Sequence, residues 1–402
     1  MPVWHDETLE LQKQGKLRMV GIIQEQHPER ARLFMQWKRM DWPVMVDSLD
    51  LLEVTYVPIT LLIDEHGIVR RIASPRADPT ALLSDFLDRE FEALAKERTG
   101  TVAPPNLATL DAPSEPATAA DWREHAEALY LWGRTERIDY AIGSYAASLR
   151  LEPEDGWTHF RAGVAYRRRA DLPAARAGDF ARAVDEWGTA LEIDPNNYIW
   201  RRRIQQYGPR LDKPYPFYDW VAEARRDIEA RGEEPEELAV EPRGAELARP
   251  ARSFAASEAA ERDREKDDRI HRDDGRLVEI ETVVVPRSVE PGATVRVHLE
   301  LRPKPESKAH WNNEVSGLVF RIEPPEGWKV DRDRIELDNP AAELGAVSEE
   351  VRRLEFEVMS PATATGAVEL PAYALYYVCE GIDGACLYRR QDIEVRVSVP
   401  TR

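Results

Sequence analysis

The sequence predicts a multidomain protein that joins an α/β part, an all-α repeat and an all-β sandwich, in that order. Strand and helix patterns alternate over residues 1–96, a helical pattern repeats in the middle, and apolar side chains recur with a period of two after residue 276. Segments rich in Pro, Ala, Thr or charge separate these parts. We therefore expect domains at 1–96, 119–231 and 276–402, with linkers at 97–118 and 232–275.

Composition narrows the classes of partner and cofactor. The chain has 402 residues and a formal net charge of −19, and a negative field repels phosphate backbones, so nucleic acid is not expected as a partner. The sequence has no run of about 18 apolar residues, so no membrane span is expected. No signal peptide is expected after Met1 either. No glycine-rich phosphate loop is present, so no cofactor is expected. His5, His27 and His66 lack a second ligand at metal spacing, so no metal is expected.

The first part contains local signals for several elements. Asp78 and Pro79 stand where the N-cap and first residue of a helix belong, ahead of a helix over 78–94. We expect the other elements from apolar periodicity. Helices are predicted at 2–14, 29–40 and, as a short one, 48–54; strands are predicted at 16–24, 42–47, 58–64 and 68–72.

Residues 54–72, VTYVPITLLIDEHGIVRRI, combine a Val-Pro step before a strand with an Asp-x-x-Gly turn at Asp64 to Gly67. With this combination, the first part resembles the thioredoxin-like family, in its TlpA and peroxiredoxin-related branch. The resemblance implies a cis Val57-Pro58 bond in a substrate-binding loop, with Val57 and Pro58 as site residues. The Cys-x-x-Cys of that family is missing here. Either the sequence begins downstream of that motif, or the domain has lost its thiols and only binds.

The middle part repeats a small-aromatic-proline pattern. Ala141, Tyr145 and Pro153 recur 42 positions later, as Ala183, Trp187 and Pro195. This spacing suits a pair of packed helices. The small residue lies where the helices cross, the ring fills the groove between them, and the proline ends the second helix. The pattern resembles the tetratricopeptide repeat, whose unit of about 34 residues is longer here. Four aromatic side chains are expected in the repeat core: Trp132, Tyr145, Tyr166 and Trp187.

Two basic triplets, at 167–169 and 201–203, stand out in this acidic chain. They are either solvated helix faces or a surface that binds an acidic partner. In the second interpretation, the residues that bind the acidic partner are Arg167, Arg168, Arg201 and Arg202.

The last part holds both cysteines of the chain, on either side of a short glycine-containing turn between two strand patterns. A tight turn places facing side chains within about 6 Å between Cα atoms, so Cys379 and Cys386 are able to form a disulfide. Residues 373–397, YALYYVCEGIDGACLYRRQDIEVRV, resemble the N-terminal immunoglobulin-like domain of the thiol:disulfide interchange protein DsbD. The resemblance implies a pair that cycles between disulfide and dithiol, in an extracytoplasmic (periplasmic) setting.

The residues themselves leave three states of the cysteines open: a redox-active pair, a static disulfide, or two inert thiols. Arg389 and Arg390 are close in sequence and would lower a thiol pKa, whereas Glu380 and Asp383 would raise it. The polar and aromatic break at His310 and Trp311 is a candidate cap over the pair, or else a packed loop.

These features favour a thiol:disulfide oxidoreductase or electron-relay protein that exchanges disulfides through Cys379 and Cys386. Its expected partners are redox proteins or client peptides. The alternative is a non-catalytic scaffold of a redox pathway, which holds partner proteins through the helical repeats.

Overall fold

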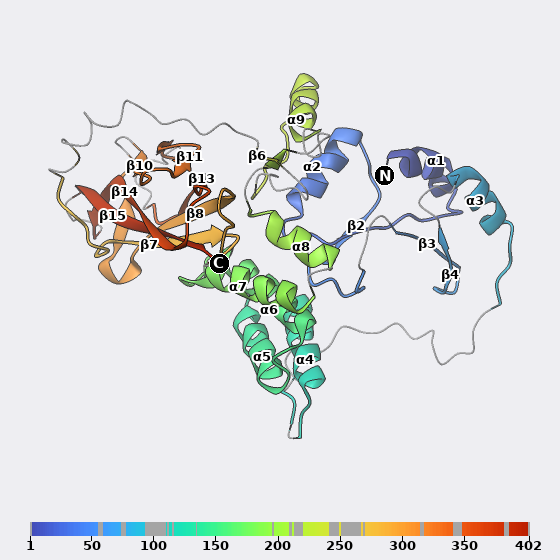
Figure 1. Ribbon diagram of the computed structural model, residues 1–402. Coiled ribbons are helices and arrows are strands. Elements are labelled where there is room, and N and C mark those ends of the chain that lie inside the picture. The colour runs from blue at the N-terminus through green and yellow to red at the C-terminus, as the bar shows by residue number, and fades with distance from the viewer. Residues whose placement is uncertain are drawn as a thin grey trace. The chain divides into compact units, whose positions relative to one another are not determined.

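The computed structural model describes residues 2–54, 59–73, 78–92, 110, 112–114, 116–133, 135–194, 197–208, 211–212, 220–240, 249–250, 267, 270–313, 317–340, 348–381 and 386–400 (Figure 1). The chain divides into two compact units. The first unit holds Met1–Ala175, Thr189–Arg203 and Phe217–Glu241, and the second holds Arg176–Gly188, Ile204–Pro216 and Pro242–Arg402. The expected α/β part and most of the helical part therefore belong to one unit, because their residues contact one another.

The N-terminal part of the first unit has most of the alternating elements that the sequence predicts, but the helix expected over 78–94 ends at Leu87. The elements are α1 (Pro2–Lys13), β1 (Gly21–Ile23), α2 (Glu29–Lys38), β2 (Val44–Val46), β3 (Thr60–Ile63), β4 (Val69–Ala73) and α3 (Pro79–Leu87). The strands β1 and β2 pair in parallel, and β3 and β4 form an antiparallel hairpin. Among the described strands, these are two separate sheets rather than one mixed sheet.

Local capping was predicted correctly at one helix, and tertiary contacts overrode a local pattern elsewhere. The Asp78 carboxylate accepts a hydrogen bond from the Thr80 amide at 3.0 Å, as an N-cap should. The short helix expected at 48–54 is wrong, since this segment consists of turns. Asp50 and Glu53 have left-handed φ angles of 52° and 49°, which end any helix there.

Apolar side chains on or next to the two small sheets are exposed, although a parallel pair such as β1 and β2 normally has both faces covered. The exposed side chains are Val20, Ile22, Met45, Val46, Leu61, Ile63, Val69 and Ile72. The buried cluster beside β3 and β4 is correspondingly small and is centred on Leu62, Ala73, Leu82 and Leu83. Burial of apolar surface therefore contributes little stability to this part.

The helical part begins at α4 (Ala119–Trp132), where Thr118 and Asp121 form a reciprocal capping box. The following helices are α5 (Ile138–Leu151), α6 (Gly156–Ala170), α7 (Asp179–Ile193), α8 (Tyr198–Gln205) and α9 (Trp220–Ala230). In Figure 1, α4 and α5 lie side by side, and they contact each other along their length. Two-residue strands β5 (Leu211–Asp212) and β6 (Arg249–Pro250) pair antiparallel.

The aromatic residues of the repeat were predicted with mixed success. Tyr145 and Trp187 are fully buried, as expected, and Tyr166 is half-buried, with the Arg169 guanidinium 5.5 Å from its ring centre. Trp132 is 48% exposed, so its assignment to the core is wrong. At about 100° per residue, Trp132 lies about 110° around α4 from the centre of the buried face that Ala126, Leu129 and Tyr130 form.

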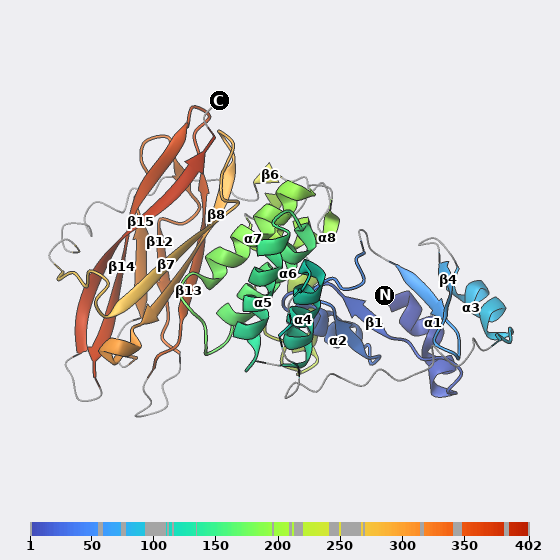
Figure 2. The same ribbon diagram turned by 90° about the horizontal axis from the view of Figure 1, so that it is seen from below.

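The C-terminal part of the second unit consists of two antiparallel sheets. The strand order of one sheet is β12-β10-β14-β15, with β9 also paired to β14, and that of the other is β11-β13-β8-β7. Figure 2 shows the long arrows of β14 and β15 side by side. The strands are β7 (Val278–Val285), β8 (Thr294–Pro303), β9 (Ala309–Trp311), β10 (Leu318–Ile322), β11 (Lys329–Val330), β12 (Arg334–Leu337), β13 (Arg352–Met359), β14 (Gly366–Glu380) and β15 (Cys386–Val399).

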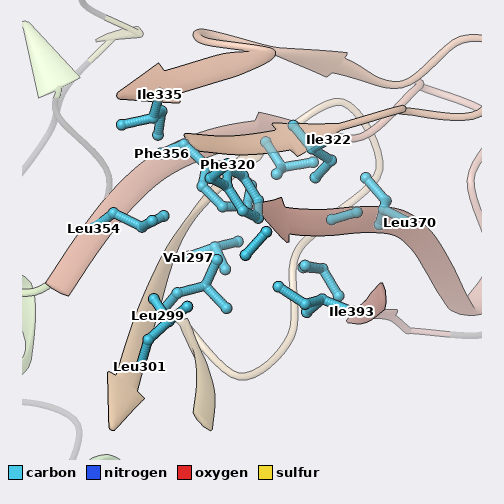
Figure 3. Close-up of a cluster of buried hydrophobic side chains, with 14 of the residues drawn as sticks. Val297, Leu299, Leu301, Phe320, Ile322, Ile335, Leu354, Phe356, Leu370 and Ile393 are labelled. Carbon is cyan, nitrogen blue, oxygen red and sulfur yellow. The ribbon is translucent and has the colours of Figure 1, made fainter. Parts of the chain in front are cut away.

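One hydrophobic core joins the two sheets, and it consists of the side chains that recur with a period of two. Phe320 of β10 and Phe356 of β13 stack with ring centres 5.1 Å apart, and Val297, Leu299 and Leu301 point into the same cluster from β8 (Figure 3). Within the described residues of 276–402, the longest helical segment is the three-residue 3-10 turn Pro305–Ser307. The period-two pattern thus predicted this two-sheet architecture.

Candidate functional site

Cys379 and Cys386 lie at directly opposed positions at one end of the ladder that joins β14 and β15. Their Sγ atoms form a disulfide, and their Cα atoms are 3.8 Å apart. The fourteen paired positions of this ladder fix the register of the two strands, so the two cysteines are held opposite each other by the whole hairpin.

The hydrogen-bond pattern of β14 explains why this position brings two side chains together. The Asn312 amide donates to the Tyr377 carbonyl, and the Gly381 amide donates to the Lys308 carbonyl. Backbone groups of β14 residues 377, 379 and 381 therefore point toward the strand β9 side. Toward β15, Cys379 consequently occupies a non-hydrogen-bonded position, where facing side chains approach most closely in an antiparallel pair.

Alternation along the strands places the disulfide on the outer face of its sheet. Tyr376 and Val378 point into the core, so Cys379, between Val378 and Glu380, points the other way. His310 of β9 is the register partner of Cys379 on the side opposite Cys386. One row across three strands therefore reads His310, Cys379, Cys386, with all three side chains on the same face.

The two sulfur-bearing residues differ in access to solvent. Cys379 is 3% exposed, because residues of two neighbouring strands flank it, whereas Cys386 at the start of β15 is exposed. Thiol–disulfide exchange begins when a thiolate reaches one sulfur along the S–S axis. Of the two cysteines, Cys386 is therefore the one accessible to an incoming thiol.

The charged residues expected near the thiols lie elsewhere. The side chain of Arg390 pairs with Asp392 at 2.7 Å and lies 3.8 Å over the Tyr373 ring, about 13 Å along the strand from Cys386. Arg389 is in register with Tyr376, whose side chain points into the core. Glu380 pairs with Arg276 at 3.0 Å. The expectation that Arg389 and Arg390 flank the sulfurs is therefore not met, and Asp383 lies outside the described residues.

The two residues of the candidate cap, His310 and Trp311, lie on opposite faces of β9. Trp311 is buried in the core, where its indole Nε1 donates to the Glu350 carbonyl at 2.8 Å and its ring packs edge-on against Tyr376. It does not cover the outer face, because adjacent residues of a strand point in opposite directions. His310 lies on that face beside Cys379, so the sequence identified one of the two residues with the right location.

The remaining predicted site residues are not next to this pair in sequence or register. Val57 and Pro58 lie outside the described residues, so the expected cis bond stays a prediction. Arg167 is buried and donates to Asp171 at 2.8 Å, and Arg168 donates to the Tyr130 carbonyl at 3.2 Å. Arg201 and Arg202 are half-buried on α8. The Arg168 bond joins α6 to α4, whereas Arg167 pairs with the C-cap residue of its own helix.

A polar cluster that the sequence did not reveal surrounds Arg161 in the first unit. Arg161 is 3% exposed, and its guanidinium donates to Glu127 at 2.6 Å, to Glu53 at 3.3 Å and to the Leu49 carbonyl at 3.1 Å. Asp50 is fully buried beside it, and burial is the main cause that raises the Asp50 pKa to about 6. The only signal in the sequence was an arginine within the otherwise buried face of α6.

The raised pKa of Asp50 predicts a pH-dependent stability. The folded state binds this proton more tightly than the unfolded state, so the free energy of unfolding should fall as pH rises from about 4 to about 6. Asp50→Asn should remove this dependence and stabilise the first unit at pH 7 by up to about 3 kcal/mol, since asparagine tolerates the left-handed φ. Urea unfolding of wild type and variant at pH 4 and pH 7 tests this, with exposed Glu154→Gln as the control. Equal stability changes at the two pH values would contradict it.

Within the described residues, no group of three or more His, Cys, Asp or Glu side chains is arranged to hold a metal ion. The same residues include no helix whose length and apolarity suit a bilayer crossing.

No protein-family model matches the sequence, and neither does any curated protein. Among solved structures, the chain is similar to Spo0M, a sporulation control protein from Bacillus subtilis, with 10% identity and a TM-score of 0.17; the match covers 31% of this chain and half of that one. It is also similar to BslA, a bacterial hydrophobin (13%, TM-score 0.16, 31% and 97% covered), and to a conjugative transposon lipoprotein from Bacteroides eggerthii DSM 20697 (19%, TM-score 0.15, 30% and 96% covered). Likenesses this weak carry no argument about function.

Proposed function

We propose that this protein exchanges disulfides with partner proteins through Cys379 and Cys386. The observation that carries the proposal is the asymmetry of the pair, with one exposed and one buried cysteine joined across a non-hydrogen-bonded position of a hairpin. A disulfide that serves only as a staple needs no accessible sulfur, whereas exchange requires one.

The reaction conserves atoms and electrons between the protein and a dithiol partner. A partner thiolate attacks the Cys386 sulfur, the S–S bond breaks, and Cys379 leaves with the electron pair. The second thiol of the partner then attacks the mixed disulfide at the partner's own sulfur, and Cys386 leaves as a thiolate. The partner ends oxidised and the protein ends as a dithiol; the reverse sequence oxidises the pair.

We further propose finer fold assignments for the parts of the chain, based on the motifs. These are a thioredoxin-like arrangement for the N-terminal part, a tetratricopeptide-like arrangement for the helices, and an immunoglobulin-like sandwich similar to the N-terminal domain of DsbD. The Asp64 to Gly67 turn between β3 and β4, the burial of Tyr145 and Trp187, and the hairpin that carries the cysteines support these assignments.

A redox titration tests the proposed function. The protein is equilibrated in glutathione buffers, and free thiols are counted with a maleimide reagent. We expect a midpoint between about −180 and −270 mV, the range of exchanging pairs, whereas a structural disulfide has a midpoint below about −300 mV. Cys379→Ser/Cys386→Ser is the control and should show no titration. A midpoint in the structural range would leave the scaffold as the better function.

A further inference from the structure

We propose that His310 is the acid that protonates the Cys379 sulfur when the disulfide opens, and the base that removes this proton when the disulfide forms again. The inference rests on the proposed exchange function and names a further residue of that reaction. Strand β9 places His310 in register with Cys379, on the face of the sheet that carries the disulfide.

Register and alternation place His310 beside Cys379. The two residues are direct partners of the ladder between β9 and β14, and Cβ atoms of such partners are about 4.5–5.5 Å apart on one face. The neighbours of His310 in the chain, Ala309 and Trp311, are both buried in the core, so the imidazole is on the outer face with the disulfide. It flanks Cys379 on the side that Cys386 leaves open.

The imidazole also has unused hydrogen-bonding capacity. His310 Nδ1 is buried, and within the described part of the chain it has no hydrogen-bond partner. A buried polar atom in this condition is uncommon and calls for an explanation, since it loses its hydration on folding. A thiol or thiolate that appears at Cys379 on reduction supplies such a partner.

The chemistry of the leaving sulfur needs a proton donor at this position. Cys379 is 3% exposed, and a thiolate released in a poorly solvated place is unfavourable. When an incoming thiolate bonds to Cys386, the S–S electron pair moves to the Cys379 sulfur. Transfer of a proton from the imidazolium to that sulfur then gives a neutral thiol and a neutral imidazole. In the oxidising direction, the imidazole takes the proton back and the Cys379 thiolate attacks the mixed disulfide.

The other polar groups around this row do not offer the same proton transfer. Tyr377 and Tyr388 pack against each other with ring centres 4.5 Å apart, and burial raises the pKa of Tyr388, so its hydroxyl stays protonated. Glu380 and Arg276 are paired with each other. Lys308 precedes β9 in the chain, and Glu350 and Arg352, which lie beside Trp311, pair with each other at 3.3 Å. Histidine is the side chain among these types that changes charge near neutral pH.

The test measures how fast dithiothreitol reduces the disulfide of the full chain between pH 5.5 and pH 8.5, with each rate divided by the concentration of dithiothreitol thiolate. We expect the normalised wild-type rate to be highest at low pH and to fall as the pH rises. His310→Gln should be about 10-fold slower at pH 6 and nearly independent of pH. His271→Gln is the matched control, because His271 is exposed in the same unit and its carbonyl, which the substitution keeps, accepts a hydrogen bond from the Arg390 amide of β15.

Each outcome decides the inference separately from the function. A normalised wild-type rate that is independent of pH overturns the role of His310 without any variant, so the test survives a variant that does not fold. A His310→Gln profile equal to that of wild type overturns it as well. The pair can cycle in the glutathione titration although the wild-type rate is independent of pH, or although the His310→Gln profile equals that of wild type. In these cases only the role of His310 fails. If the pair does not cycle, the proposed function fails.

Discussion

In the Cys379→Ser variant, the remaining thiol at Cys386 should react with dithionitrobenzoate about 100-fold faster than the Cys379 thiol that remains in Cys386→Ser. Cys386 is exposed at the start of β15, whereas Cys379 is 3% exposed between two paired strands. A buried thiol reacts only after local opening, and an opening free energy of about 3 kcal/mol reduces the reactive fraction by about two orders of magnitude. Stopped-flow measurement at pH 8 gives both rates.

Unfolding provides the control for this difference. In concentrated urea the two thiols lose their separate environments, so the two variants should react at rates within a few-fold of each other. Equal rates in the native proteins would contradict the assignment of Cys386 as the attacked sulfur. The same measurement on wild-type protein, before and after reduction, reports how many thiols the native disulfide removes.

The direction of attack follows from this asymmetry and not from nearby charge. Arg389 and Arg390, which the sequence placed close to the cysteines, are separated from them by strand alternation and by about 13 Å along β15. Access and the neighbouring histidine are therefore the features of this site that distinguish one sulfur from the other.

Local patterns predicted the elements whose determinants are close in sequence. Asp78 and Pro79 begin α3 as expected, because the cap bonds an amide only two residues away. The sandwich strands were found because every second side chain is buried. The hairpin that carries Cys379 and Cys386 was predicted because the two cysteines are only seven positions apart in the sequence.

Features that depend on distant contacts were not predictable from these patterns. The apolar spacing of residues 48–54 suggests a helix, but the carbonyls of Leu49 and Asp50 turn toward Arg161, more than 100 positions away. The strand pairing beside Cys379 was equally hidden, because β9 reaches β14 across 69 positions of sequence. His310 was recognised as unusual, but its register with Cys379 required the structure.

The largest expected effect on stability comes from Arg161→Met in the first unit. Methionine retains much of the buried volume but removes the donors to Glu127, Glu53 and the two carbonyls of the turn. Removing one partner of a buried ion pair leaves the other charge without compensation, and we expect a loss of about 3–5 kcal/mol in the free energy of unfolding. Urea unfolding, followed by hydrogen exchange of peptides from α6, measures it.

The loss should depend on pH in a direction that identifies its cause. Burial already raises the pKa of Glu127, and Arg161 counteracts this. Without the guanidinium, the folded state holds the Glu127 proton more tightly still, so the deficit should be larger at pH 8 than at pH 5, where the carboxyl is more protonated. A double-mutant cycle with Glu127→Gln isolates this pair, and exposed Arg150→Met is the matched control. The assignment would be contradicted by a deficit no larger than that of Arg150→Met, or by a deficit that is the same at both pH values. The charge of Arg161 would then not be what holds the turn at Leu49 and Asp50 against α6.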